Sequence, residues 1–165
     1  FVGCSFSYFL QMCKTLNKNI NAYAIEDFFR ENKYKINCYD TFLNSMKRAD
    51  VFDLVKHIVF PPYLACKFFP DKSVDCIFIN SDNRFEDYYL DIINWYPKIK
   101  SNGIIIGNMI SQYSNTVEII KKALKDLEID HFFVCKSLSD SNCYYWVLNN
   151  PEVLLSSQKF IYCRI

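Results

Sequence analysis

Glycine is scarce in this chain: only three of the 165 residues are glycine, at positions 3, 103 and 107. The G-x-G-x-x-G spacing of dinucleotide-binding turns is therefore absent from the turn near Gly3, which counts against a nicotinamide-dependent oxidoreductase. Long apolar runs are absent as well, because no stretch approaches the roughly 18 residues that span a bilayer. The first residues also lack the charged-then-apolar order of a signal peptide. The sequence thus predicts no membrane partner.

Blocks of like charge are also missing. The chain carries 19 basic and 18 acidic side chains, mixed along its length, for a formal charge of +1. A nucleic-acid-binding track or a polybasic membrane patch needs clustered positive charge, and the sequence has no such cluster. We therefore expect small molecules or proteins as partners rather than nucleic acids, and self-association into a homo-oligomer stays open.

Cysteine is plentiful, but the motifs that often explain it are missing. The eight cysteines include no C-x-x-C pair, and no histidine stands beside them. Five of them lie inside apolar runs, where a thiol behaves as a small buried hydrophobic group. This usage is typical of a reducing compartment, and we expect a cytoplasmic protein.

Apolar and aromatic residues are abundant, at 51% and 18% of the chain. A chain of this length buries about 70% of the surface that its unfolded form exposes, so it needs no disulfide bond or structural metal to be stable. We expect one domain over residues 1–165 with a large core. The sequence starts at Phe1 as though inside a strand, and we expect that an N-terminal segment is missing before it.

The strongest pattern begins with a short apolar run, Val74–Ile79, which predicts a buried strand. The polar cluster Asn80–Asn83 predicts a loop directly after it. A helix follows and is closed by Pro97. Its apolar residues recur at steps of three and four, as one helical face requires: Phe85, Tyr88, Tyr89, Ile92, Ile93 and Tyr96.

A second apolar strand completes this unit. Ser101–Gly103 predicts a turn, and Ile104–Ile106 predicts a strand that ends at Gly107 and Asn108. Strand, helix and strand within about 35 residues is the size of one βαβ unit, and continuous apolar strands favour a parallel sheet covered on both faces. In such sheets ligands bind at the carboxyl ends of the strands, which directs attention to Asn80–Asn83 and Asn108.

The first residues predict a similar arrangement. Phe1 and Val2 end a short strand, Gly3–Ser5 forms a turn, and a helix with Ser5 or Ser7 as its N-cap follows. A strand at Ile20–Ile25 then closes at the acidic pair Glu26-Asp27. This order is the first half of a nucleotide-binding α/β domain. The buried helix face is predicted to contain Phe6, Phe9, Leu10, Cys13 and Leu16.

The other elements are predicted from caps and apolar spacing. They are a loop over Phe28–Asn37, a helix over Thr41–Ala49 capped by Asp40, a strand at His57–Phe60, one or two helical turns at Tyr63–Phe69, a helix that starts at Asn115 or Thr116, an antiparallel hairpin of Phe132–Cys135 and Cys143–Leu148, and a last strand at Gln158–Cys163.

With these elements placed, the sequence resembles class I S-adenosylmethionine-dependent methyltransferases, and in particular the small-molecule O-methyltransferase group typified by macrocin O-methyltransferase. The segment YDTFLNSMKRADVFDLVKHI carries part of the likeness, together with a helix that ends in Trp-x-Pro-Lys and a strand after a glycine turn. The resemblance runs from Gly3 to about Leu127. It implies a Rossmann-like methyltransferase fold of α/β class, with a mostly parallel sheet.

The resemblance also implies a place for S-adenosylmethionine. In this family the turn after the first strand holds the methionine end of the cofactor, and an acid at the end of the second strand binds both ribose hydroxyls. Glu26 matches that acid, with Asp27 as a substitute. Gly3 matches the turn, where a second family glycine is missing. Cofactor contacts are implied for Cys4, Ser5 and Ser7 in or near the turn, and for Tyr63 or Phe60 beside the adenine ring.

The metal-binding positions of the family depart from its pattern. The family has an aspartate, a histidine and a His-Asp pair where this chain has Asn80, Asn83, Asn108 and Met109. A hard divalent ion prefers carboxylate oxygens, so no metal is predicted. The carboxylates that remain nearby are Asp82, Glu86 and Asp87.

These departures leave competing functions open. A small-molecule O- or N-methyltransferase that works without metal would face its acceptor with Asn80, Asp82 and Asn83, and His57 could serve as a base. A catalytically inactive methyltransferase-like module, kept for protein interaction, is the alternative. A nicotinamide-dependent oxidoreductase is the third hypothesis.

Overall fold

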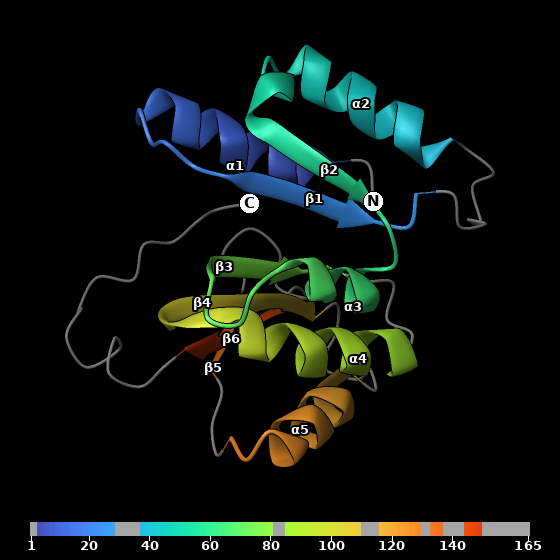
Figure 1. Ribbon diagram of the computed structural model, residues 1–165, viewed down its shortest axis with the longest axis vertical. Helices are drawn as coiled ribbons and strands as arrows, with labels where there is room; N and C mark the ends of the chain where they lie inside the picture. Colours follow the sequence, from blue (N-terminus) through green and yellow to red (C-terminus); the bar gives the residue numbers. More distant parts are fainter. Residues whose placement is uncertain are drawn as a thin grey trace. The chain divides into compact units, whose positions relative to one another are not determined.

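The computed structural model describes residues 3–28, 37–80, 85–109, 116–129, 133–136 and 144–149. These residues fall into two compact units, the first ending at Ala65 (unit 1) and the second beginning at Cys66 (unit 2) (Figure 1). The single domain over residues 1–165 stays a prediction. The predicted loop 28–37 and the predicted strand at 158–163 lie mostly or wholly outside the described residues. In the described ranges, every helix is too short or too polar to span a bilayer.

Unit 1 contains a two-stranded parallel sheet, the helices α1 and α2, and two shorter helical segments. The strands pair in register from Ala22 opposite Val55 to Glu26 opposite Val59. The strand predicted to end at Phe1 and Val2 lies outside the described residues. The other predicted helices and strands of this unit are present, with ends shifted by a few residues. The elements are α1 (Cys4–Thr15), β1 (Ala22–Glu26), α2 (Cys38–Arg48), η1 (Phe52–Leu54), β2 (Val55–Val59) and α3 (Pro62–Ala65).

One apolar core holds unit 1 together. Leu10 of α1 and Met46 of α2 are fully buried, and both pack with side chains of the two strands. The helical spacing of Leu10 and Cys13 correctly predicted buried positions, but Leu16 is 61% exposed because α1 ends before it. The buried members are Leu10, Ala22, Phe28, Cys38, Phe42, Met46, Val51 and Val55.

The helix caps differ from the predicted ones. Gly3 is the N-cap of α1 and no side chain caps that end, so neither Ser5 nor Ser7 does so. In α2, Asn37 is the cap: its Oδ1 accepts from the amide of Asp40 at 3.0 Å, while its Nδ2 donates to the carboxylate of Asp40 at 2.7 Å. The predicted cap at Asp40 is wrong, because α2 begins earlier in the sequence. Asn37 is its N-cap and accepts the hydrogen bond from the amide of Asp40.

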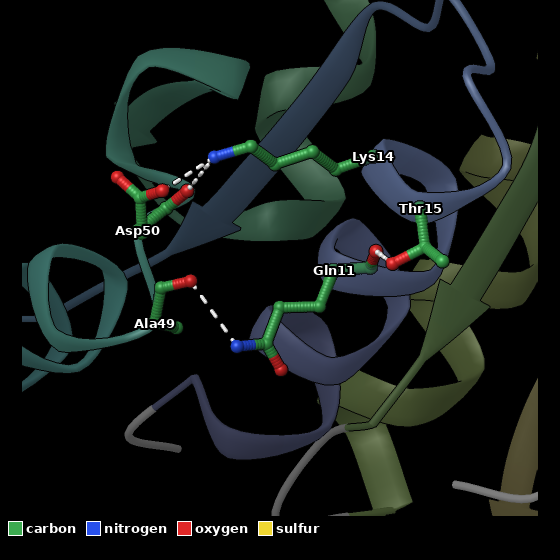
Figure 2. Close-up of polar contacts among 5 residues, drawn as sticks. All are labelled: Gln11, Lys14, Thr15, Ala49 and Asp50. Carbon is green, nitrogen blue, oxygen red and sulfur yellow. Dashed lines mark hydrogen bonds and ion pairs between the residues drawn. The ribbon is translucent and has the colours of Figure 1, made fainter.

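The carboxyl end of α2 is capped by side chains of α1 (Figure 2). Lys14 Nζ donates to the carbonyl of Asp50 at 2.9 Å and to its carboxylate at 2.5 Å, and Gln11 Nε2 donates to the carbonyl of Ala49 at 3.1 Å. The last carbonyls of a helix lack partners within the helix, so these bonds satisfy groups that would otherwise face water. They align α1 with the end of α2.

Replacing Lys14 by methionine is expected to remove a pH-dependent part of the stability. The hydrogen bond from Lys14, followed by its charge, lowers the pKa of Asp50 below its ordinary value of 3.8. Because the folded-state pKa is lowered, this stabilisation is present above the unfolded-state pKa and is lost as the pH falls through the folded-state value. Urea midpoints of the two proteins should therefore differ more at neutral pH than in strong acid. An equal difference at both would contradict the role of the ion pair.

Unit 2 contains a four-stranded sheet in the order β3-β4-β6-β5. Strands β3 and β4 are parallel, as predicted, whereas β6 is antiparallel to both β4 and β5. The elements are η2 (Cys66–Phe68), β3 (Val74–Ile79), α4 (Phe85–Trp95), η3 (Tyr96–Lys98), β4 (Ile99–Met109), α5 (Thr116–Asp126), β5 (Phe133–Lys136) and β6 (Tyr144–Asn149). The predicted α/β class is confirmed.

Helices α4 and α5 pack with β3 and β4 around a second core. Tyr88 and Ile92 are fully buried, which confirms the predicted face of α4, but Tyr96 lies beyond the end of α4 and is 37% exposed. Asp91 is also buried. The core residues are Ile79, Tyr88, Ile92, Ile105, Ile119, Ile120, Ala123 and Leu124.

The predicted turn at Ser101–Gly103 is wrong, because these residues lie within β4. The register shifts there: Val74 pairs with Ile99, whereas Cys76 pairs with Ile104. A side chain at Gly103 would approach the carbonyl oxygens of Asp75 and Val74 to 2.9 and 3.0 Å. Glycine is therefore needed for close backbone contact in an irregular strand pair.

Candidate functional site

The predicted residues of unit 1 gather at one end of its sheet. Helix α1 runs opposite to β1, so α1 begins at the end of the unit where β1 finishes (Figure 1). This places Gly3, Cys4 and Ser5 at the same edge as Glu26 and Asp27. The predicted turn at Gly3–Ser5 is wrong, because Cys4 and Ser5 already belong to α1. Helix α3, which contains Tyr63, contacts β1 as well. We call this group the carboxyl edge of unit 1.

The amino end of α1 is open to an anion. Cys4 and Ser5 are exposed, the first turn contains no acidic side chain, and no side chain among the described residues caps the helix. Backbone amides at a helix amino end and the helix dipole both favour negative charge. This end of α1 therefore has the chemistry to hold a carboxylate.

Gly3 is required by packing, independent of any ligand. Its φ angle of +81° lies in the left-handed region, and a Cβ there would come within 2.6 Å of Met46 Cε and 2.8 Å of Phe42 Cδ2. Ser7 is likewise occupied by the protein, since it is buried and its hydroxyl donates to the carbonyl of Cys4 at 2.8 Å. Both positions are thus explained by the local structure of α1.

Glu26 is the last residue of β1, where the sequence predicted an acid at a strand end. Its side chain is half-buried, and Oε1 accepts a hydrogen bond from the amide of Asp27 at 3.1 Å. A carboxylate has about four acceptor positions in all. Asp27 and Tyr63 are half-buried, and Phe60 is 40% exposed.

His57 lies inside β2, opposite Ala24, and two residues before the end of the strand. Its Nδ1 is 2.9 Å from Tyr39 Oη, and its ring packs near those of Tyr39 and Phe52. The side chain thus forms an aromatic and polar contact with α2 and η1. These contacts favour a packing role for His57, which its place in an apolar run also indicated, over a role as a base.

The second group lies at the carboxyl edge of unit 2. Ile79 pairs with Gly107, so the next residues, Asn80 and Asn108, occupy neighbouring positions beyond that pair. Asn80 is exposed. Asn108 pairs in turn with Tyr145 of β6. The sequence did not predict this pairing, because no local signal indicates that β6 inserts beside β4. The other predicted acceptor residues, Asp82 and Asn83, lie outside the described residues.

The donor set at this edge does not suit a divalent ion. Of the four positions where the resembled family has acidic and histidine ligands, the described ones are occupied by Asn80 after β3 and by Asn108 and Met109 at the end of β4. Among the described residues there is no group of three or more histidine, cysteine, aspartate or glutamate side chains that could hold a metal. Glu86 and Asp87 stand in the first turn of α4. Carboxamides instead supply neutral hydrogen-bond donors and acceptors.

A protein-family model described as "Methyltransferase domain" matches residues 1–108. None of the curated proteins matches the sequence.

The structure is also similar to several solved ones. Precorrin-6y C5,15-methyltransferase from Geobacter metallireducens has a TM-score of 0.59 at 16% identity, with 89% of this chain and 74% of that chain covered. Precorrin 8w decarboxylase from Methanobacterium thermoautotrophicum has a TM-score of 0.59 at 18% identity, covering 88% and 77%. An O-methyltransferase family protein from Burkholderia thailandensis has a TM-score of 0.62 at 9% identity, covering 88% and 48%. At such identities these likenesses show the fold alone, which is Rossmann-like.

Proposed function

The chain belongs to the methyltransferase domain family, and from this membership we propose that it binds S-adenosylmethionine and transfers the methyl group to an oxygen or nitrogen of a small molecule. The observation that carries the proposal is the carboxyl edge of unit 1, where an uncapped helix end and the acid that closes β1 lie at the same end of the sheet. Membership of the macrocin-like subgroup, a cytoplasmic location and the small-molecule acceptor belong to this proposal.

The carboxyl edge of unit 1 has groups that suit each end of the cofactor. The amino end of α1, at Gly3, Cys4 and Ser5, would hold the methionine carboxylate through backbone amides. Glu26 would accept hydrogen bonds from the two ribose hydroxyls, because a carboxylate offers acceptors to both donors. Tyr63 has the ring needed to stack on adenine. When bound, the cofactor supplies an electrophilic methyl group on a sulfonium.

Polar residues after β3 are proposed to orient the methyl acceptor. Methyl transfer depends mainly on positioning the nucleophile against the methyl group, and side chains that form neutral hydrogen bonds can orient an acceptor hydroxyl or amine. Asn80 is the described residue proposed for this role, together with Asp82 and Asn83. We propose that the reaction needs no metal.

Calorimetric titration with S-adenosylmethionine and with its demethylated product tests cofactor binding. We expect saturable binding of both ligands, with about one site per chain, because the proposed contacts involve the carboxylate, ribose and adenine that the two share. Absence of S-adenosylmethionine binding at millimolar concentration would exclude the proposed methyltransferase activity. NADH, titrated in parallel by fluorescence quenching, tests the nicotinamide alternative, for which we expect no signal.

A catalytically inactive module is the second candidate. The observation in its favour is the replacement of family acidic and histidine positions by Asn80, Asn108 and Met109. It predicts cofactor-independent association with a protein partner or with a second copy of the chain. Light scattering of the purified protein, combined with transfer of a radiolabelled methyl group to candidate small molecules, separates the two functions.

A further inference from the structure

The side chain of Phe42 contacts both segments of unit 1 that are proposed to hold the cofactor. Phe42 belongs to α2 and is only 3% exposed. Its ring lies against the start of α1, because a Cβ at Gly3 would come within 2.8 Å of Phe42 Cδ2 and 3.2 Å of Phe42 Cε2. The same ring packs with that of Phe28, with 5.0 Å between the ring centroids. Since Phe28 directly follows the acidic pair at the end of β1, one buried ring joins the two segments.

Phe28 fixes the path of the chain directly after Glu26 and Asp27. It is buried, and its ring packs with Tyr39 as well as with Phe42, at a centroid distance of 5.2 Å from Tyr39. Before the acidic pair, the chain is held by the pairing of β1 with β2. Because closely packed interiors leave side chains little room to move, these contacts restrict where the carboxylate of Glu26 can lie.

The separation of the two segments matters for a ligand that is held at both ends. S-adenosylmethionine joins a carboxylate, proposed for the amino end of α1, to ribose hydroxyls, proposed for Glu26, through a short chain of atoms. Two contacts reinforce each other in one molecule only where their spacing matches its span. A core side chain that contacts both segments can therefore set the affinity without touching the ligand.

We propose that Phe42 is a positioning residue for S-adenosylmethionine, which together with Phe28 sets the separation between the amino end of α1 and the carboxylate of Glu26. The inference rests on the proposed function and goes beyond it, because both rings are buried and act through the segments on which they pack.

The first experiment compares the whole cofactor with its two parts. Phe42→Leu keeps an apolar side chain in the core but removes the ring. The variant should bind S-adenosylmethionine between about ten- and a hundredfold more weakly than the wild-type protein, because the two contacts no longer match the span of the ligand. Adenosine and methionine, titrated separately, each need only one segment, and their affinities should change by less than about twofold. Equal weakening of all three ligands, or no weakening of any, would overturn the proposal.

Val51→Ala is the control for a loss of core stability. Val51 is 1% exposed and packs in the same core, but it lies beyond the carboxyl end of α2. The variant should unfold at a lower urea concentration and keep its affinity for S-adenosylmethionine. If it lost as much affinity as Phe42→Leu, affinity would follow the stability of the core rather than the position of one ring, and the inference would be wrong.

The second experiment tests whether Phe28 and Phe42 act together. Phe28→Leu should also weaken S-adenosylmethionine binding, and the double variant should lose no more affinity than the weaker-binding single variant, since the two rings form one contact. Losses that add would show that the rings act separately and would contradict the proposal. Where Phe42→Leu does not fold, unchanged affinity in Phe28→Leu decides against it as well.

The wild-type titration separates this inference from the proposed function. Wild-type protein that does not bind S-adenosylmethionine would overturn both. Binding that Phe42→Leu and Phe28→Leu leave unchanged would overturn the positioning role alone and leave cofactor binding in unit 1 intact.

Discussion

Replacing Glu26 by alanine is expected to weaken S-adenosylmethionine binding by between about ten- and a hundredfold. The variant removes a carboxylate proposed to accept hydrogen bonds from two ribose hydroxyls, and hydrogen bonds to a charged group contribute about 1.5–3 kcal/mol. Glu26 is half-buried at the end of β1, so the bonds would be partly shielded from water. Calorimetric titration of wild-type and variant protein measures the change.

Two further acids serve as comparisons for Glu26. Asp27 is its neighbour at the same edge, and Asp27→Ala tests whether that residue takes the ribose role instead. Glu118 is exposed on α5 in unit 2, so Glu118→Ala controls for the loss of one negative charge. Unchanged affinity in Glu26→Ala together with a large loss in Asp27→Ala would transfer the role to Asp27. Equal losses in all three variants would show a general charge effect and contradict a specific contact.

Replacing Gly3 by alanine is expected to destabilise the fold by about 2 to 5 kcal/mol, with or without cofactor. Two costs add. The φ angle of +81° places an alanine in the left-handed region, and its Cβ would come within 2.6 Å of Met46 Cε and 2.8 Å of Phe42 Cδ2. Both neighbours are core residues of unit 1, so they have little room to move. Urea unfolding followed by circular dichroism measures the loss.

Ser5→Ala is the matched control for Gly3→Ala, because Ser5 is exposed in the first turn of the same helix. It should change stability by no more than about 0.5 kcal/mol. Should Gly3→Ala retain full stability and lose only cofactor affinity, the close approach of a ligand, rather than packing on α2, would explain the glycine.

Regular apolar patterns were enough to predict most of the elements. The unbroken run at Val74–Ile79 became β3 with the bounds expected, and the spacing of Tyr88 and Ile92 identified the buried face of α4. These predictions succeed because a strand covered by helices and a helix packed on a sheet each require apolar side chains at a fixed period. The strand-end positions of Glu26 and Asn80 followed from the same reasoning.

Caps and irregular backbone were predicted less well. Ser5, Ser7 and Asp40 are all residues that can cap a helix, yet Gly3 and Asn37 are the N-caps. Local sequence shows only which residues are able to cap, whereas the cap that forms depends on where the chain enters the helix. The turn predicted at Ser101–Gly103 belongs to β4 instead. Gly103 lies close to the backbone of β3, and local sequence does not show a contact with a strand so distant in the chain.

The sequence by itself determined the α/β class, the order of helices and strands, and the acid and amide residues at the strand ends, since all of these depend on neighbours a few residues away. Only the tertiary structure decided that Gly3 packs against Phe42 and Met46, and that β6 inserts beside β4 with Tyr145 opposite Asn108. Strand order and close packing join residues far apart in the chain, so no local pattern contains them.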